Sequence, residues 1–345
     1  MERLIIVSIT GASQIYKTLG TIGLKKGQVK ALLPDWWEDS VAATETGTWE
    51  LVTLLSRRLS IDAAGLIEGR LLPIGSASRM AYKHRADMPV DSYKASSLIG
   101  GALAHAVLFA MPQPLALPSM NPAVIRETIR GDCNGLVDFD GVLRFCWASG
   151  IPVIPLPHLP LGVRKMDGAA LLMDTRPAII ISRKNDSRAW LSFILAHELG
   201  HYCCGHLDND SAIIDVSLKT DATSQSEASG DLQEREADAF ALALLGGPTA
   251  ATAVDAWNPR ASGVELAVNA RGAAPALGVA AGHLVLRHAF RTKRWAEAHT
   301  ALQFLDEDFD AQSALTSALQ TSIDMNRLAD DMQELVASVT GIARV

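Results

Sequence analysis

The feature that most constrains this chain is an apolar helical stretch, residues 188–204, that carries three ionisable side chains in its second half. His197 and His201 are four residues apart, so they lie one turn apart on one face of a helix, and Glu198 lies at the edge of that face. Gly205 then ends the helix. Because charged and polar groups inside an apolar helix need partners or a metal ion, the stretch predicts a core helix that presents a cluster of ligand atoms.

The spacing of these three residues is the H-E-x-x-H pattern of a zinc site. Neutral imidazole nitrogen binds zinc at about 2.0–2.1 Å, and two histidines one helical turn apart can reach the same ion. Zinc lowers the pKa of a bound water molecule, and the glutamate takes a proton from that water. We therefore predict His197 and His201 as zinc ligands and Glu198 as the general base. The alternative, a surface helix that carries the three side chains by coincidence, fits poorly with so apolar a sequence.

A catalytic zinc site needs a third protein ligand and one open position. Residues 232–245 form a second predicted helix, which the Gly-Gly-Pro at residues 246–248 ends. On this helix Glu234 and Asp238 face the same way, one turn apart. We predict Glu234 as the third ligand and Asp238 as the acceptor of the outer N–H of a ligand histidine, which fixes the histidine tautomer. The alternative role for Glu234 is a capping box with Asp231 as the N-cap.

Three more residues near the pattern are candidates for contacts to a substrate or to a developing oxyanion: Tyr202, His206 and Arg188. His206 also competes as a third ligand, but it lies beyond the predicted helix end. We interpret it as a residue that lines the cleft, or as a polar loop histidine. Glu236 points away from the predicted ligand face of its helix, so we expect it in solvent.

The pattern around the two helices predicts an α+β fold, in which a small antiparallel sheet precedes the active-site helix. Residues 151–156, 169–173 and 178–182 are predicted strands, and the last two form a hairpin. The edge of the strand at 178–182 could pair with an extended substrate. Mainly helical regions flank this sheet on both sides. The predicted regions are residues 1–122, 123–250 and 251–345.

Short helical patterns fill the N-terminal region. Residues 49–59 carry apolar side chains at helical spacing, and residues 60–62 can cap a second short helix. Residues 72–89 are basic and punctuated by Pro and Gly, so they are predicted as a loop. Residues 95–111 are small and apolar, which predicts a buried helix.

Two separated motifs, in this order, resemble the ImmA/IrrE family of metallopeptidases: Leu-Ala-His-Glu-Leu-Gly-His at 195–201 and Glu-Arg-Glu-Ala-Asp-Ala-Phe-Ala-Leu-Ala-Leu-Leu at 234–245. The resemblance covers residues 137–247. It implies metal binding by His197, His201 and Glu234, and catalysis by Glu198. It also implies that the chain is a zinc-dependent endopeptidase, with manganese as a second possible metal. The implied substrate is a specific protein, a transcriptional repressor or regulator of a phage, mobile-element or stress circuit.

The chain departs from this family at residues 207–230, a segment rich in Asp, Ser and Thr that is longer than the usual connection. A loop there could gate the cleft, or it could be an uninvolved surface excursion, which is the interpretation that we favour.

Composition narrows the classes of function. The formal charge of −7 and the pI near 5.7 argue against a protein that binds nucleic acid over its whole surface. No stretch approaches the roughly 18 uninterrupted apolar residues of a membrane span, and the start of the chain lacks the pattern of a signal peptide. Four cysteines without a C-x-x-C suggest neither disulfides nor a thiolate zinc site. We therefore expect a cytoplasmic protein.

The flanking regions leave a second class of function open. Residues 264–290 could form a helix-turn-helix-like unit with a basic end, and residues 49–66 could form half of another. Such a unit would bind DNA or dock a protein. The acidic, amphipathic residues 306–345 suit intramolecular packing or formation of a homo-oligomer. The alternative function is therefore a DNA- or protein-binding regulator on a catalytically idle peptidase scaffold. The complete set of five predicted site residues favours the peptidase.

Overall fold

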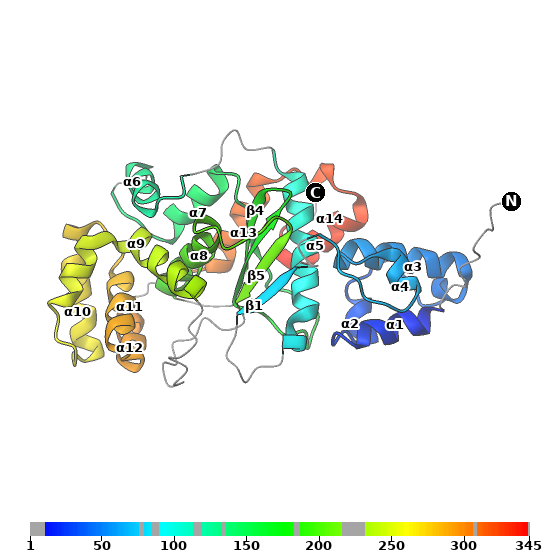
Figure 1. Ribbon diagram of the computed structural model, residues 1–345, viewed down its shortest axis with the longest axis horizontal. Coiled ribbons are helices and arrows are strands. Elements are labelled where there is room, and N and C mark those ends of the chain that lie inside the picture. The colour runs from blue at the N-terminus through cyan, green and yellow to red at the C-terminus, as the bar shows by residue number, and fades with distance from the viewer. Residues whose placement is uncertain are drawn as a thin grey trace.

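The computed structural model describes residues 11–75, 79–83, 90–112, 119–132, 135–182, 187–215, 232–305 and 309–343. The described chain is elongated, with a sheet in the middle and helical groups at both ends (Figure 1). One end holds α1 (Ala12–Gly20), α2 (Lys26–Lys30), α3 (Glu45–Leu59) and α4 (Ala63–Ile67). The opposite end holds α10 (Gly263–Leu277), α11 (Ala281–Thr292) and α12 (Trp295–Leu305).

The central sheet has five strands among the described residues: β1 (Met80–Lys83), β2 (Val153–Pro155), β3 (Gly168–Met173), β4 (Arg176–Ile181) and β5 (Ser211–Asp215). Their order is β1-β5-β3-β4-β2. β3 runs antiparallel to both β4 and β5, whereas β1 and β2 each run parallel to their neighbour. The mixed α+β class is confirmed, but the prediction of a purely antiparallel sheet is wrong. Since β4 is paired on both sides, it also offers no free edge to a substrate.

Two segments that the sequence analysis treated as loops contain strands. β1 lies within the predicted loop at residues 72–89, and β5 lies within the segment at 207–230. Both strands are short, and their polar flanks hide the pattern that marks a longer strand. Residues 216–230 of the second segment lie outside the described part of the chain.

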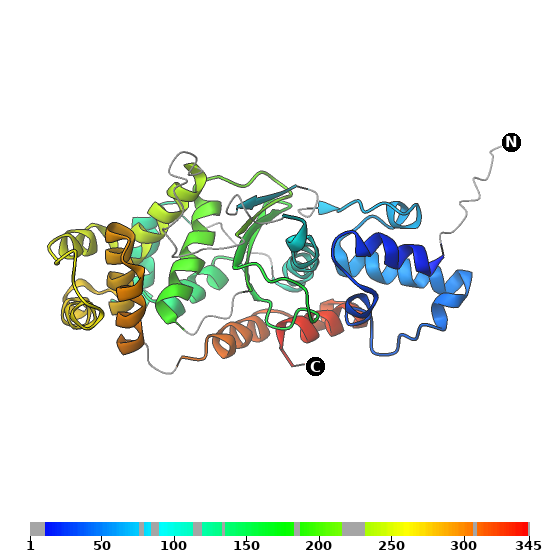
Figure 2. The same cartoon turned by 90° about the horizontal axis from the view of Figure 1, so that it is seen from below.

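Both faces of the sheet are buried. Ala169, Leu171 and Ile214 point into one apolar cluster, while Ala170 and Ile213 point into another. This alternation is the two-residue period of strands, and burial of both faces explains why the strands read as continuous apolar runs. The first cluster includes α5 (Lys94–Ala110), and the second includes α7 (Phe139–Ala148) and α8 (Arg188–Cys203). The sheet is therefore the middle layer between helices, as Figure 2 shows.

The predicted hairpin is confirmed as β3–β4, with a tighter turn than expected. Asp174 and Thr175 alone connect the strands, and their φ angles are 47° and 67°. Positive φ at both positions is the geometry of a type I′ turn, although a branched residue such as Thr175 adopts it at a cost. The side chains of Asp210 and Asn209 accept hydrogen bonds from these two backbone N–H groups, at 3.2 and 2.8 Å, and hold the turn.

α9 (Leu232–Asp255) is broken near its middle. Gly247 has φ 64° and ψ −171°, and Pro248 follows it, so the predicted stop is real although a further helical segment continues beyond it. Carbonyl groups before the break lose their helical donors. Arg126 on α6 (Pro122–Asp132) donates to two of them, at 2.7 and 3.1 Å, and Arg287 donates to a third at 3.0 Å. These arginines replace the missing helical hydrogen bonds.

Of the described helices, α9 alone is long and apolar enough to cross a membrane by length and composition. Half of that apolar stretch is buried inside the protein, and the helix packs against α6, α8 and α11. α9 therefore packs as a core helix of the folded protein.

The helical ends confirm several local predictions. Asp62 caps α4 by accepting a hydrogen bond from the Gly65 N–H at 2.6 Å. The predicted buried helix at 95–111 is α5.

The C-terminal segment forms α13 (Ala311–Ser322) and α14 (Asp330–Thr340), which run along one side of the molecule toward the N-terminal helices (Figure 2). The apolar face of α14 packs into the first cluster, through Leu335, Val336 and Val339.

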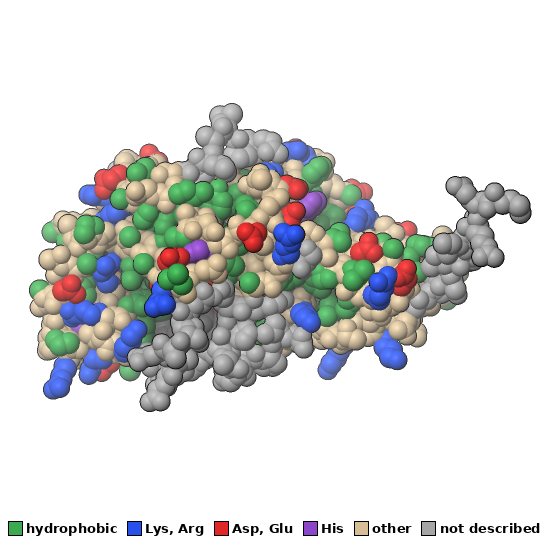
Figure 3. Space-filling view, in the orientation of Figure 1, with side chains coloured by type: hydrophobic (Ala, Val, Ile, Leu, Met, Phe, Trp, Pro, Cys, Tyr) green, Lys and Arg blue, Asp and Glu red, His purple; other side chains and the backbone are tan. Residues whose placement is uncertain are grey.

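The predicted helix-turn-helix-like unit corresponds to α10 and α11, joined by a three-residue turn. Six of the twelve residues of α11 are buried between α8, α9, α10 and α12 and only Arg291 is exposed, so the helix offers little exposed face to a groove in DNA. Arg291 donates to the backbone carbonyls of Asp255 and Trp257, at 2.8 and 3.2 Å. On the face in Figure 3, basic side chains at this end of the molecule stand among acidic ones. DNA binding and the division of the chain at residues 122 and 250 stay predictions.

Replacing Arg126 by alanine tests the account of the α9 break. The substitution leaves two buried carbonyl groups without a donor, so we expect the free energy of unfolding to fall by roughly 2–3 kcal/mol in a denaturant titration. The control is Arg130→Ala, because Arg130 lies one turn further along α6 and is partly exposed. Similar losses for both variants would contradict the account.

Candidate metal centre

The residues of the candidate site come from three elements, of which α8 and α9 carry the predicted ligands and β5 carries a further one. α8 supplies His197 and His201, which are 1 % and 0 % exposed, and α9 packs across α8 and supplies Glu234. β5 supplies Asp215, a fully buried residue at the C-terminal end of that strand. Register places Asp215 opposite Gly168 of β3. The close packing of these elements brings four ligand atoms from distant parts of the chain into one place.

The four ligand atoms lie within 4.8 Å of one another. The two imidazole Nε2 atoms are 3.1 Å apart. Oxygens of Glu234 lie 3.4 Å from the Nε2 of His197 and 3.5 Å from that of His201, and Asp215 Oδ2 lies 3.2 and 3.9 Å from the same nitrogens. Ligands about 2.0–2.1 Å from a tetrahedral ion are about 3.3 Å apart. The distances between these atoms therefore match the size of a tetrahedral zinc site.

The outer ring nitrogens of both histidines have hydrogen-bond partners. His197 Nδ1 lies 2.9 Å from Asp238 Oδ1, the contact predicted for Asp238. His201 Nδ1 lies 3.0 Å from His206 Nδ1, and His206 Nε2 lies 2.9 Å from Glu236 Oε2. A carboxylate only accepts, so His206 donates to Glu236 through Nε2 and accepts through Nδ1. His201 therefore donates through Nδ1, and both Nε2 atoms are left to face the centre as ligands.

The end of α8 explains how His206 reaches this position. Gly205 has φ 73°, and the His206 N–H donates to the carbonyl of His201 at 3.0 Å. This turn folds the chain back, so that the His206 ring meets the ring of His201. Glu236 is exposed, as expected, but its carboxylate also accepts a hydrogen bond from His206. Sequence spacing on α9 alone gives no sign of this partner.

Glu198 is fully buried beside the four ligand atoms. Both of its carboxylate oxygens lack a hydrogen-bond partner among the described residues. Burial raises the pKa of Glu198 well above its usual value, and the neighbouring Asp215 raises it further. The space comes from Gly168, since a Cβ built on Gly168 would lie 2.1 Å from Glu198 Oε1. A glycine in β3 is thus required for the position of the Glu198 carboxylate.

The buried carboxylates and imidazole nitrogens at the site form an arrangement that a cation would stabilise. Burial by itself lowers the pKa of His197, but the neighbouring carboxylates of Asp215, Asp238 and Glu234 outweigh it and raise the pKa well above its usual value. Buried oxygens of Asp215 and Glu234 also lack hydrogen-bond donors among the described residues. A divalent metal ion held here would supply the missing positive charge, and the two Nε2 atoms and these orphaned oxygens are the ligand atoms available to it. The donor set of two imidazoles and carboxylates suits zinc and also suits manganese.

Arg188 and Tyr202, two residues predicted to contact substrate, make other contacts in this structure. Arg188 is at the start of α8, where it pairs with Asp138 and Asp140 and stacks 4.8 Å from the ring of Phe309. It is nine residues before His197, or roughly 13 Å along the helix. Tyr202 is 7 % exposed in the second apolar cluster, and burial raises the pKa of its hydroxyl. His206, by contrast, lies at the site, against His201.

Asp215 is the site residue that the sequence analysis missed. It ends the short apolar run Ala212–Ile214 in a segment interpreted as an uninvolved excursion. An aspartate that ends a buried strand is a recognisable signal, but the strand itself was not recognised. The expectation that this segment is uninvolved is therefore wrong for residues 211–215. Asp231, the alternative cap for Glu234, lies outside the described residues.

Comparison with known families places this site in a peptidase domain. Residues 146–245 match the model of the IrrE N-terminal-like domain, the M78 family of peptidases. The match runs from the end of α7 to the break in α9, and includes the four ligand atoms and Glu198. The chain thus contains a domain similar to the IrrE N-terminal-like peptidase domain, and this domain covers less than a third of its length. No curated protein matches the chain significantly.

Replacing His206 by alanine tests the chain of contacts behind His201. Loss of the acceptor frees the His201 ring to rotate and to change tautomer, so we expect zinc affinity to fall roughly 10–100-fold in competition with a chromophoric chelator. His158→Ala serves as the control, because His158 is exposed and lies on a different element. Unchanged zinc affinity in His206→Ala would show that His206 does not orient His201.

Proposed function

We propose that this chain is a zinc-dependent endopeptidase that cleaves a specific protein, a transcriptional repressor or other regulator. The observation that carries the proposal is the buried carboxylate of Glu198 beside two imidazole Nε2 atoms that are 3.1 Å apart. A peptidase family domain with a matching donor set supports the hydrolysis of peptide bonds. The regulatory substrate rests on the family resemblance.

In this proposal His197, His201 and Glu234 hold the ion. Zinc held by these residues would supply Lewis-acid chemistry, which polarises a scissile carbonyl and lowers the pKa of a water molecule. Glu198 accepts the proton of that water and returns it to the leaving amine. Burial suits Glu198 to both tasks, because its raised pKa makes the carboxylate a better base and the carboxylic acid a usable donor. Asp238 and His206 keep the two ligand rings in place.

A second candidate function is a DNA- or protein-binding regulator built on a catalytically idle peptidase scaffold, and Asp215 is the residue that favours it. Catalytic zinc sites keep one open position, whereas four protein ligands close a structural site. Asp215 Oδ2 is 3.2 Å from His197 Nε2, within the same tetrahedral spacing as the other three ligand atoms. If Asp215 binds the ion permanently, no position is left for water. If it instead stands beside Glu198, the site is catalytic, and this is the arrangement that we propose.

Replacing Glu198 by glutamine tests the peptidase. The variant keeps all proposed ligands, so we expect it to bind zinc as wild type does and to lose cleavage by a factor of roughly 10²–10⁴. Each zinc-loaded protein is incubated with a lysate of its host, and new protein N-termini are mapped by mass spectrometry. Wild type with a chelator is the second control. New termini that also occur with Glu198→Gln would rule out Glu198 as the base.

Replacing Asp215 by asparagine separates the two candidates. If Asp215 stands beside Glu198 and does not bind the ion, we expect Asp215→Asn to lose less than about tenfold in zinc affinity and to cleave more slowly. If Asp215 is a fourth ligand of the ion, its replacement weakens zinc binding more strongly and opens a position for water. Calorimetric zinc titration beside the cleavage assay distinguishes the outcomes. A large loss of affinity together with increased cleavage would favour the closed, idle site.

A further inference from the structure

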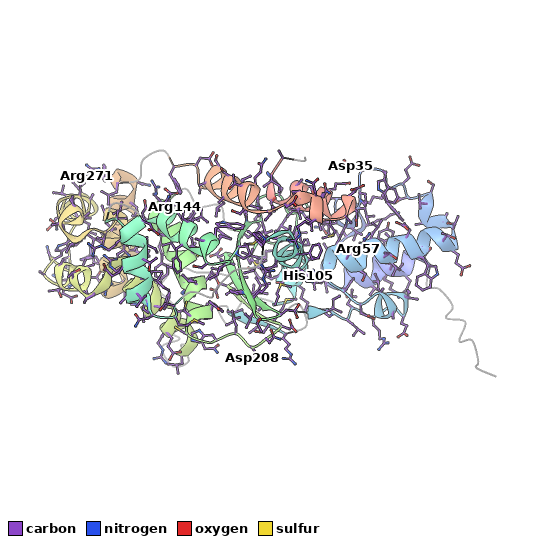
Figure 4. The ribbon with its side chains drawn as sticks, turned by 90° about the horizontal axis from the view of Figure 1, so that it is seen from above. Asp35, Arg57, His105, Arg144, Asp208 and Arg271 are labelled. Carbon is purple, nitrogen blue, oxygen red and sulfur yellow. The ribbon has the colours of Figure 1, made fainter. Side chains whose placement is uncertain are left out.

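A cavity of about 470 Å³ lies at the Met173 end of β3, and the candidate metal centre lies at the Gly168 end of the same strand. It is enclosed by the end of α3, the middle of α5, and the stretch from η4 (Met325–Arg327) into α14. Figure 4 shows Arg57 on α3 and His105 on α5 on the two sides of this junction. The volume is within the usual range of about 300–1,000 Å³ for sites that bind small molecules.

The interior of the cavity is apolar. Six of its lining residues are Ala102, Ala106, Phe109, Met173, Leu328 and Met332. Phe109 is 55 % exposed although it is a large aromatic side chain, and Ile74 at the same cavity is 48 % exposed. Covering exposed apolar side chains around a concave surface with an apolar ligand lowers the free energy, because their apolar surface is removed from water.

Positive charge gathers at the rim. Arg327 lies 5.3 Å from the ring of Phe109 and donates to the Met111 carbonyl at 2.9 Å. Among the described residues, no carboxylate pairs with Arg327. Burial lowers the pKa of Arg176, and repulsion from the nearby charge of Arg327 lowers it further. Arg57, also at the rim, forms a 2.9 Å ion pair with Asp331 and so contributes less net charge.

We propose that this cavity binds a small amphiphile with one anionic headgroup, such as a medium-chain carboxylate. Its apolar tail would cover Phe109, Met173 and Met332, and its headgroup would lie by Arg327, where it would relieve the repulsion between the two arginines. An uncharged apolar molecule fills the same volume but leaves Arg327 unpaired. The proposal does not depend on the metal centre or on peptidase activity.

The test uses the full-length protein with decanoate and, as its uncharged counterpart, decanol. Binding of each is measured by equilibrium dialysis below the concentration at which decanoate forms micelles. Three variants are compared with wild type, and circular dichroism establishes that each is folded. Arg327→Gln removes the charge, His105→Trp fills the cavity from an exposed position, and Arg260→Gln removes an exposed charge near α10 as the matched control.

We expect saturable binding of one decanoate per chain, with tighter binding than for decanol. Arg327→Gln should weaken decanoate binding about threefold and leave decanol binding unchanged, as expected for a partly exposed charge pair. His105→Trp should weaken binding of both ligands at least tenfold, and Arg260→Gln should change neither.

Three results would overturn the proposal. The first is equal affinity for decanol and decanoate, which would indicate an apolar site without charge selection. The second is decanoate binding that folded His105→Trp retains, which would place the ligand elsewhere. The third is a dimer in sedimentation that His105→Trp dissociates, which would mean that a second copy of the chain covers the cavity.

Discussion

The approach of two buried imidazole Nε2 atoms to 3.1 Å is the interaction on which the rest of this structure depends. Both rings donate outward through Nδ1, to Asp238 and to His206, so their inner nitrogens present lone pairs to each other and to carboxylates. Such an arrangement is unfavourable without a cation, because buried acceptors that face only acceptors keep their full desolvation cost. Metal binding would therefore stabilise the folded chain as well as supply the chemistry of the proposed site.

The sheet determines which further groups reach this centre. β3 is the central strand, and its register with β5 sets Gly168 opposite Asp215, so the one residue without a side chain leaves room for Glu198. At its other end β3 carries Met173, which lines the proposed ligand cavity. One short strand thus contacts both the candidate metal centre and the cavity. The α9 break, held by Arg126 and Arg287, ends the helix that presents Glu234 and Asp238.

Local chemistry explains which parts of the fold could be predicted from the sequence. α8, the first half of α9 and the cap at Asp62 each depend on residues within about one or two turns, and all three occur where their patterns indicated. β1 and β5 pair with each other across more than 100 residues, and neither is long enough to show a period. Asp215 and the contact between His206 and Glu236 were missed for the same reason: they depend on tertiary packing of β5, α8 and α9. Arg188 is close to the motif in sequence, but nine residues separate it from His197 along α8, and it pairs with Asp140 at the start of that helix.

The most direct test of the metal centre is X-ray absorption at the zinc edge on the zinc-loaded protein. The account predicts a shell of nitrogen and oxygen ligands only, at about 2.0–2.1 Å, with the multiple-scattering signature of two imidazoles. Cys203 and Cys204 lie at the end of the same helix and provide the competing ligands. A sulfur shell at about 2.3 Å, or the signature of fewer than two imidazoles, would contradict the assignment of His197 and His201 as the ligands on which the proposed function rests.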